Sequence, residues 1–239
     1  MGERSRSPLP ASFELDGESY ELEHTFKLDW LSAVGRYRGG SGSLILKIYR
    51  ARNLWGLPVR WLTSRMAQRE ARILSSAAGV AGVPASFGTW CGTGILHAFL
   101  EGHPLRADES VRADFFDEFD ERLAAIHDLG IAYVDLSKRD NLLVGEDGLP
   151  CLIDFQIAWA WPTPGLFSVL PGFIGRWILA RLQRADRHHA LKHRGRVLPE
   201  SLSDGQRAEL ARPAFPIRLH RFLVRPYQKW RRKRSRAAK

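Results

Sequence analysis

The chain has 239 residues and a formal net charge of +10. This length suits one large domain or two small lobes with a buried core. A hydrophobic content of 44% and a charged content of 26% exclude a disordered or fibrous protein. The charge is unevenly distributed, because residues 212–239 contain eleven basic and no acidic residues, whereas residues 1–211 carry a net charge of −1. The basic segment and the rest of the chain therefore have to be interpreted separately.

The elements follow one another in a clear order along the chain. Residues 1–18 are polar and rich in turn formers, and we expect them to be loose. Apolar alternation and flanking turn residues predict strands at 20–31, 33–37, 43–49, 85–90 and 94–100, with glycines at 39–42 forming a hairpin. Helical spacing of apolar residues predicts helices at 61–78 and 111–128. Two short apolar runs, 141–144 and 151–155, bracket a turn at 145–148.

Strands that come first and helices that come later, with one helix inserted among the strands, predict an α+β chain in two lobes. We expect a small β-rich lobe over residues 19–100 and a reduced helical lobe over residues 101–211. A basic, aromatic tail over residues 212–239 follows them.

Composition also bears on the location of the chain. Cys91 and Cys151 are too few for a disulfide framework or a four-ligand zinc site, and the first ten residues show no signal peptide. The apolar stretch 159–182 is interrupted by proline, glycine and arginine, so we predict that it is buried or interfacial and not transmembrane. We expect a cytoplasmic chain, and the basic tail adds a peripheral position at the inner face of the membrane as a hypothesis.

Four charged residues are candidates for a functional site because of the elements in which they lie. Lys47 lies in an apolar strand, Glu70 on the next helix, Asp135 in a loop, and Asp154 at the end of a short apolar strand. Taken singly, the lysine and the glutamate are typical of a solvated surface, and Asp135 is typical of a turn. Asp154 is harder to explain in this way, because a lone carboxylate in an apolar run is costly without a partner. Their joint order favours a functional interpretation.

The order of Lys47, Glu70, Asp135 and Asp154 along the chain resembles that of the protein-kinase-like superfamily. Members of that superfamily have a strand lysine, a helix glutamate, a catalytic loop and a metal-binding aspartate in this order. The sequence looks closest to the small bacterial lipopolysaccharide-kinase and RIO-like group. The resemblance rests on Asp135-Leu-x-Lys-x-x-Asn141 and on Asp154-Phe-Gln in place of Asp-Phe-Gly. Residues 123–130 resemble the helix before the catalytic loop, and residues 99–105 resemble the hinge. The resemblance implies a bilobal protein-kinase-like fold, with ATP and Mg²⁺ as cofactors.

The resemblance also implies roles for individual residues. Lys47 would contact the α- and β-phosphates and be held by Glu70, and Asn141 and Asp154 would bind Mg²⁺ through oxygen. Asp135 would accept or orient the proton of the attacking hydroxyl.

Three further residues take supporting roles under the same resemblance. Lys138 is predicted to contact the transferring γ-phosphate, and Ser32 with its neighbouring amides to cover the phosphates. Glu101 begins the segment 101–105, which would line the adenine pocket mostly through backbone groups.

The sequence departs from the protein-kinase pattern in four respects. Residues 28–35 contain one glycine where the glycine-rich loop is expected, and Tyr133-Val134 replace the His-Arg before the catalytic aspartate. Asn141 lies one residue later than usual, which makes Asp140 a rival metal ligand. No Ala-Pro-Glu follows Asp154 at the normal distance. We therefore do not expect a conventional protein kinase regulated through its activation loop.

We predict that the chain transfers the γ-phosphoryl group of ATP to a hydroxyl acceptor, and that the acceptor is a sugar of a lipopolysaccharide-type glycolipid. One alternative is an atypical Ser/Thr protein kinase. Another is a pseudokinase-type ATP-binding protein, or a membrane or RNA adaptor without catalysis.

Basic segments outside this pattern leave alternatives open. Residues 182–196 are rich in arginine, lysine and histidine, and we interpret them as a solvated basic face. The tail 212–239 fits an interfacial helix on an anionic membrane, a nucleic-acid contact, or a helix packed on the body. The apolar stretch 159–182 favours the membrane surface over nucleic acid.

Overall fold

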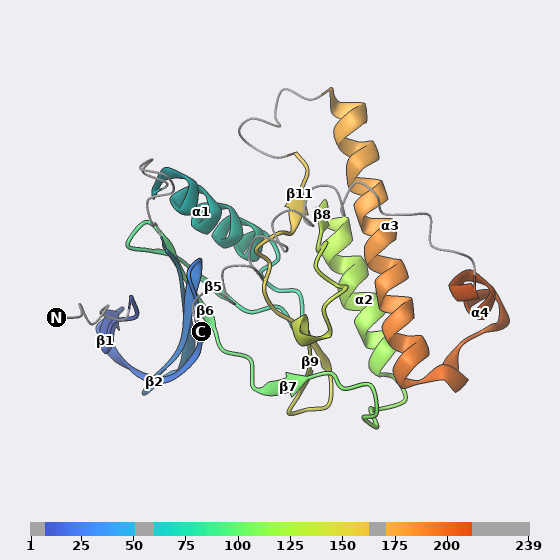
Figure 1. Ribbon diagram of the computed structural model, residues 1–239, viewed down its shortest axis with the longest axis horizontal. Helices are drawn as coiled ribbons and strands as arrows, with labels where there is room; N and C mark the ends of the chain where they lie inside the picture. The colour runs from blue at the N-terminus through green and yellow to red at the C-terminus, as the bar shows by residue number, and fades with distance from the viewer. Residues whose placement is uncertain (1–7, 51–59, 163–170, 212–239) are drawn as a thin grey trace.

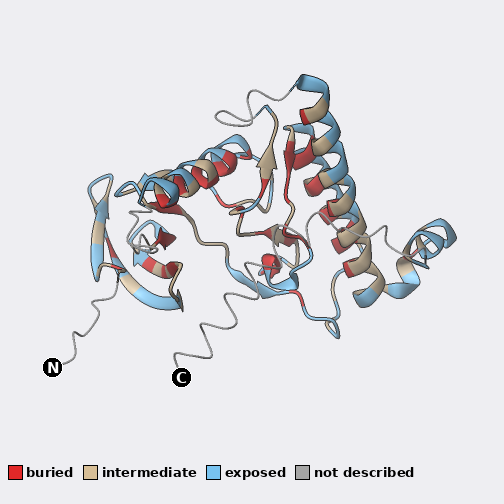
Figure 2. Ribbon diagram, turned by 45° about the horizontal axis from the view of Figure 1, so that its top comes forward, coloured by how far each residue is buried: buried red, intermediate tan, exposed pale blue. Residues whose placement is uncertain are grey.

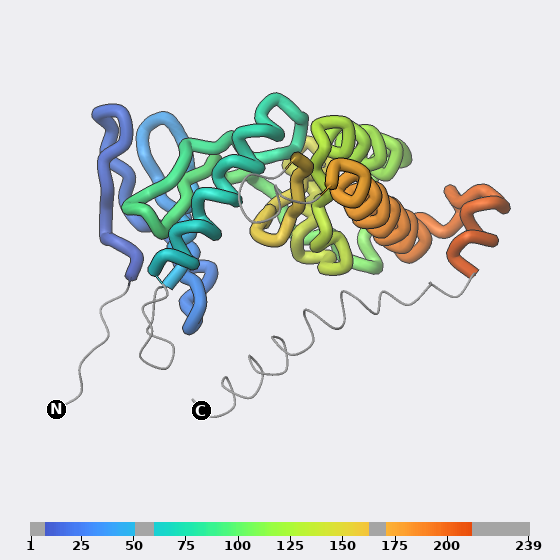
Figure 3. Tube along the Cα trace, turned by 90° about the horizontal axis from the view of Figure 1, so that it is seen from above, coloured from blue at the N-terminus to red at the C-terminus, as the bar shows by residue number. Residues whose placement is uncertain are grey.

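The computed structural model describes residues 8–50, 60–162 and 171–211. The strands between residues 12 and 98 form one end of the molecule and the helices between residues 115 and 211 the other, with the helix at residues 60–76 alongside the strands (Figures 1 and 3). The α+β organisation in two lobes that the order of elements predicted is therefore confirmed.

The β-rich lobe is built on one antiparallel sheet of six strands, in the order β1-β2-β3-β4-β6-β5. The hairpin expected at the glycines joins β3 to β4, where Gly39 pairs with Gly42. The other strands lie close to their predicted ranges. The six strands are β1 (Ser12–Leu15), β2 (Glu18–Leu28), β3 (Ser32–Gly39), β4 (Gly42–Tyr49), β5 (Ser86–Trp90) and β6 (Gly94–Ala98).

The N-terminal segment differs from the prediction. Residues 1–18 were expected to be loose, but Ser12–Leu15 form β1, which pairs antiparallel with β2. The ring of Phe13 packs against Tyr20 and Tyr37, and Leu9 is buried in the same cluster. The short polar segment is ordered because these two apolar side chains cover one face of the sheet, a long-range contact that local composition does not reveal.

Helix α1 (Arg60–Ser76) packs against β4, β5 and β6. Its buried side chains recur at helical spacing and include Ala67, Glu70, Ala71 and Leu74. This helix therefore directs one carboxylate, that of Glu70, into the protein.

The helical lobe centres on α2 (Phe115–Asp128) and α3 (Gly172–Val197), which lie side by side (Figure 1). The apolar stripe of α2 is fully buried, and Arg194 of α3 forms ion pairs with Asp117 and Asp120 of α2. A short helix, α4 (Asp204–Ala211), follows α3. Small sheets complete the lobe: β10-β9-β7 (Pro150–Leu152, Leu142–Gly145 and Gly102–Pro104) and β11-β8 (Trp159–Ala160 and Ile131–Ala132).

Two apolar clusters stabilise the lobes. The smaller one fills the face of the sheet that β1 covers. The larger one runs from α1 and Ile95 of the β-rich lobe to the buried faces of α2 and α3, so the interface between the lobes is part of a continuous core (Figure 2).

The basic region 182–196 is more than the solvated face we expected. It belongs to α3, and Asp186, Ala190 and His193 on one side of that helix are buried. No helix within the described ranges is long and apolar enough to cross a membrane. The tail 212–239 lies outside the described residues.

Candidate active site

Two predicted residues lie next to the ammonium group of Lys47. Its Nζ lies 2.9 Å from Oε1 of Glu70 and 2.6 Å from Oδ1 of Asp154. The hydroxyl of Tyr49 donates a hydrogen bond to the other oxygen of Glu70. We call Lys47, Tyr49, Glu70 and Asp154 the lysine cluster.

The positions of these side chains follow from their elements. Lys47 sits on β4 opposite Ile95 of β6, and Glu70 lies on the buried side of α1. Lys47 and Glu70 are only 6% and 1% exposed. Because an unpaired buried charge is strongly unfavourable, each of the two needs the opposite charge of the other inside the protein.

The pKa values reflect this pairing. Burial opposes the charge on Lys47, but the attraction of Glu70, with smaller contributions from Tyr49 and Asp154, raises its pKa well above the usual value. Burial likewise opposes the charge on Asp154, yet the Lys47 ammonium lowers its pKa. The cluster thus holds a cation between two carboxylates, and a cation at this place is suited to bind phosphate oxygens.

A second group of predicted residues lies in the loop after β8. The Nδ2 of Asn141 donates a 3.0 Å hydrogen bond to Oδ2 of Asp135, and the ammonium of Lys138 donates to the same oxygen. Asp135 and Asn141 are buried, whereas Lys138 is half exposed. We call Asp135, Lys138 and Asn141 the loop cluster.

The backbone before Asp135 is strained. Val134 has φ 71°, a conformation that is rare for a β-branched residue. Asp186 of α3 holds it there: its Oδ1 accepts the Val134 N–H at 2.8 Å and its Oδ2 accepts the Tyr133 N–H at 2.7 Å. Asp186 was not predicted from the sequence, although it is the only acidic residue between positions 155 and 199, and this isolation is a signal that could have indicated it.

Two histidines reinforce this support from α2 and α3. His127 lies 3.2 Å from Oδ2 of Asp186, and Nε2 of His193 donates to the carbonyl of Leu136 at 2.6 Å. Burial lowers the pKa of His193, so it is neutral at pH 7 and can donate from Nε2. The loop that carries Asp135 is therefore held by Asp186 and His193 of α3, and His127 of α2 contacts Asp186.

The two clusters are connected through the segment around Asp154. The Ile153 N–H donates to the Asn141 carbonyl at 3.1 Å, and the Tyr133 hydroxyl donates to the Ile153 carbonyl. The charge of Lys138 also contributes to lowering the pKa of Asp154. The structure thus brings together six predicted residues: Lys47, Glu70, Asp135, Lys138, Asn141 and Asp154.

Ser32 and Glu101 do not belong to these contacts. The Ser32 and Leu31 amides both donate to Oδ1 of Asp29, at 2.8 and 2.9 Å, so this turn is organised by an aspartate and not by glycines. The Glu101 carboxylate is exposed and forms a 2.6 Å ion pair with Arg36 on β3. Its side chain connects the segment between the lobes to the sheet.

The donor set can be compared with what Mg²⁺ requires. Asp154 and Asn141 offer carboxylate and carboxamide oxygens, the ligands that Mg²⁺ prefers. Asp140 is exposed, whereas Asn141 is buried beside Asp135. Within the described residues, no group of three or more His, Cys, Asp or Glu side chains could hold a metal ion. These residues fit an ion that takes its remaining ligands from phosphates and water.

His97 is a further residue that the sequence did not indicate. It lies on β6 two residues after Ile95, which pairs with Lys47, so it shares a sheet face with Lys47. Burial is the main reason that the pKa of His97 is lowered to about 4, and the Lys47 charge also lowers it. A hydrogen bond to the Ala98 carbonyl acts in the opposite direction and raises the pKa. His97 is therefore a neutral group beside the lysine cluster at pH 7.

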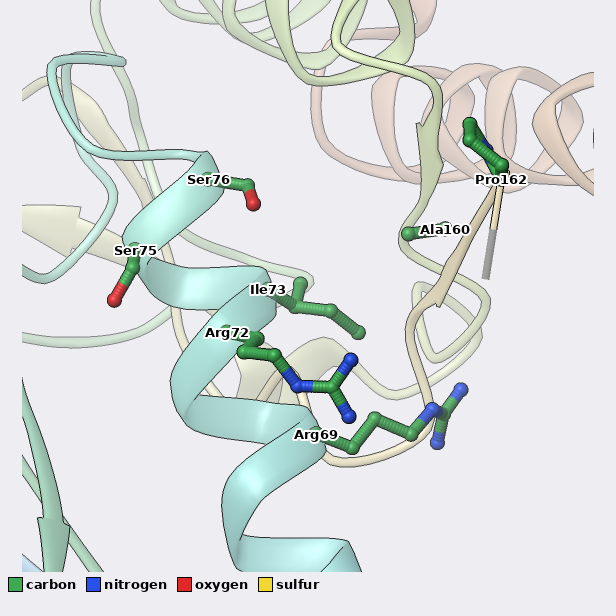
Figure 4. Close-up of a pocket in the computed structure, with 7 residues that line it drawn as sticks. All are labelled: Arg69, Arg72, Ile73, Ser75, Ser76, Ala160 and Pro162. Atoms are coloured by element: carbon green, nitrogen blue, oxygen red, sulfur yellow. The ribbon is translucent and has the colours of Figure 1, made fainter. Parts of the chain in front are cut away.

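Arg69 connects α1 to the segment after Asp154. Its guanidinium donates to the carbonyls of Gln156, at 3.2 Å, and Ala158. A cavity of about 400 Å³ lies here between α1 and β11, and the side chains of Arg69 and Arg72 extend into the space that Ala160 and Pro162 border (Figure 4).

No protein-family model and no curated protein sequence matches this chain. Among solved structures, it is similar to the crystal structure of the Rio2 kinase–ADP/Mg²⁺–phosphoaspartate complex from Chaetomium thermophilum. The TM-score is 0.53 with 15% sequence identity, over 77% of this chain and 58% of that chain. The likeness establishes the fold: the chain has a bilobal protein-kinase-like fold with a small β-rich N-lobe and a helical C-lobe. It spans less than two thirds of the length of that kinase chain.

Proposed function

We propose that this chain is an ATP-dependent phosphotransferase that uses a hydroxyl group as acceptor. The observation that carries the proposal is the placement of a buried carboxylate, Asp135, in hydrogen-bond contact with Asn141 and Lys138, next to the Lys47–Glu70–Asp154 ion pairs. Phosphoryl transfer needs positioned groups and charge neutralisation more than covalent help, and these residues supply both.

Each cluster has a defined task in the reaction. Lys47 binds phosphate oxygens of ATP, and Asn141 and Asp154 hold the metal ion. Mg²⁺, when bound, neutralises negative charge on the phosphates. Asp135 takes the proton of the acceptor hydroxyl as that oxygen bonds to the γ-phosphorus and the bond to the β–γ bridging oxygen breaks, which leaves ADP. Lys138 balances charge on the transferring group.

For the acceptor, we propose a sugar hydroxyl of a lipopolysaccharide-type glycolipid. The support is the resemblance of the Asp135–Asn141 loop and of Asp154-Phe-Gln to the lipopolysaccharide-kinase group. A protein Ser/Thr hydroxyl is the competing acceptor, and a non-catalytic adaptor is the competing function.

The test compares two Asp→Asn changes in the same loop. The full chain is incubated with Mg²⁺, labelled ATP and, separately, cell-envelope glycolipid, purified core oligosaccharide and envelope proteins. Asp135→Asn should reduce transfer by about 10²- to 10⁴-fold and leave nucleotide binding within a few-fold. Asp140→Asn, the exposed neighbour, is the matched control and should remain active.

The outcomes separate the hypotheses. Label on the oligosaccharide supports the glycolipid acceptor, and label on protein alone supports the competing one. Transfer that is absent with all three acceptors, or equal in the wild type and Asp135→Asn, would refute the catalytic proposal.

A further inference from the structure

The N-terminal half of α3 exposes two large aromatic side chains. Phe173 is 68% exposed and Trp177 is 64% exposed. They are four residues apart and therefore lie on the same side of the helix. Figure 2 shows the first turns of α3 largely exposed, and in Figure 1 this end of the helix extends beyond α2.

The same side of the helix is strongly basic. Arg176, Arg181, Arg184 and Arg187 are all exposed, and α3 contains no acidic residue except the buried Asp186. The guanidinium of Arg181 lies over the Trp177 ring, 6.0 Å from its centroid. This surface, which we call the α3 face, is defined by Phe173, Arg176, Trp177, Arg181 and Arg184.

The opposite side of α3 fixes the orientation of this surface. Gly175 is buried against the ring of Trp161, so closely that a Cβ at this position would lie 2.3 Å from it. Asp186 and His193 attach the next turns to the loop around Asp135. Because the inner side is held at both places, the helix cannot rotate to bury its aromatic side chains without breaking these contacts.

We propose that the α3 face docks on an anionic lipid bilayer. Aromatic side chains partition into the region between headgroups and acyl chains, and arginines are attracted to anionic headgroups. Nucleic acid would satisfy the arginines, but the outward aromatic pair on a rigid helix favours a bilayer, which offers an apolar layer to enter. The inference deepens the proposed function, because it names the surface at which the chain meets the membrane of a glycolipid acceptor.

The geometry connects this surface to the site. Trp177 precedes Asp186 by nine residues, which corresponds to about 13 Å along a helix. Asp186 in turn binds the backbone directly before Asp135. A bilayer bound at the α3 face would thus be connected to the Asp135 loop by one straight helix, which sets the distance between the loop and the lipid headgroups.

The experiment measures vesicle binding by the full chain without ATP, so that it is independent of catalysis. Cosedimentation uses vesicles of phosphatidylcholine with 30% phosphatidylglycerol, and of phosphatidylcholine alone. Phe173→Ser/Trp177→Ser should lower the partition coefficient on anionic vesicles by about tenfold or more, because two aromatic side chains that would be buried in the bilayer are removed. Arg176→Gln/Arg181→Gln/Arg184→Gln should remove most of the preference for anionic vesicles.

A matched control comes from α1, where Trp61 and Leu62 are 63% and 45% exposed. Trp61→Ser/Leu62→Ser should change vesicle binding less than twofold. Thermal unfolding of the four proteins checks that these exposed substitutions leave the fold intact.

Three results would overturn the inference. The α3 double variant could bind vesicles as well as the wild type, the α1 double variant could lose binding equally, or the α3 changes could weaken binding to single-stranded RNA while vesicle binding stays the same. If Asp135→Asn shows no catalytic defect but the α3 variants fail to bind vesicles, the proposed function falls and the docking surface stands.

Discussion

The lysine cluster and the loop cluster contain similar chemical groups but are assembled in different ways. Lys47 meets Glu70 across 23 residues of sequence and Asp154 across 107, from both lobes. Asp135, Lys138 and Asn141 lie within seven consecutive residues. The first cluster therefore depends on how the lobes pack on each other, whereas the second depends on how one loop is held.

Their burial also differs. Lys47 and Glu70 of the lysine cluster are buried opposite charges that neutralise each other, so removal of either one leaves the other as an unpaired buried charge. The loop cluster has one member, Lys138, that is half exposed, and its support comes from Asp186 and His193 of α3. We expect mutations in the lysine cluster to lower mainly the folding stability, and mutations in the loop cluster to change mainly the position of the Asp135 carboxylate.

The largest effect is expected for Lys47→Met. Glu70 would remain buried without a cation, and the free energy of unfolding should fall by about 3–5 kcal/mol. Chemical denaturation measures this loss. Glu70→Gln in the Lys47→Met background should restore part of the stability, and Lys27→Met, which breaks a half-exposed ion pair, should cost less than about 1 kcal/mol. If the double variant is no more stable than Lys47→Met, the lysine cluster is not an interdependent unit.

Asp186→Asn tests the support of the loop cluster. An amide is uncharged and has one acceptor oxygen, so one of the Tyr133 and Val134 N–H groups loses its acceptor beside a strained residue, and the other keeps only a neutral one. Stability should fall by about 2–4 kcal/mol, and phosphoryl transfer should decrease more than nucleotide affinity. Asp117→Asn removes an exposed partner of Arg194 and serves as the control. Equal losses of transfer and nucleotide affinity would argue against a specific role in positioning Asp135.

The pH dependence of the folding stability tests the surroundings of the lysine cluster through its neighbour His97. The folded-state pKa of His97 is about 4, below an unfolded value of about 6.5, so the unfolded chain binds a proton first as the pH falls. Stability contributed by neutral His97 is complete above about pH 6.5 and is lost towards pH 4. From pH 7 to pH 5 this loss is about 2 kcal/mol.

The measurement is denaturant unfolding at pH 7 and pH 5. His97→Gln should lose about 2 kcal/mol less than the wild type over this interval, while His24→Gln, on the exposed side of β2, should behave like the wild type. Parallel pH profiles of wild type and His97→Gln would show that His97 is accessible to protons in the folded state.

Tyr49→Phe should have the smallest effect. It removes one hydrogen bond to a charged group, worth about 1.5 kcal/mol, and leaves the Lys47–Glu70 ion pair in place. Tyr20→Phe, which removes a hydrogen bond to the partly exposed Glu18, should be nearly neutral. A loss for Tyr49→Phe as large as that of Lys47→Met would mean that the tyrosine, and not the ion pair, holds Glu70.

Several residues that the sequence singled out lie together in the structure, and each of them is marked by a local pattern. Asp135 and Asn141 share one short loop, Lys47 stands out as a charge within an apolar strand, and Asp154 stands out in a short apolar run of sequence. The sequence did not predict β1, because Phe13 and Leu9 are ordered by a sheet that only the folded chain provides. Asp186 and His193 were missed for a related reason: in a basic helix they look solvated, and their burial depends on the packing of α3 on α2.

Adjacent side chains of α1 have consequences for motion between the lobes. Glu70 binds Lys47 of the sheet, while Arg69 binds carbonyls of the segment after Asp154 in the other lobe. A rotation of α1 that withdrew the carboxylate would also pull the guanidinium from its carbonyls. Any opening of the space between the lobes is therefore expected to bend the chain elsewhere and to move α1 and the segment after Asp154 as one body.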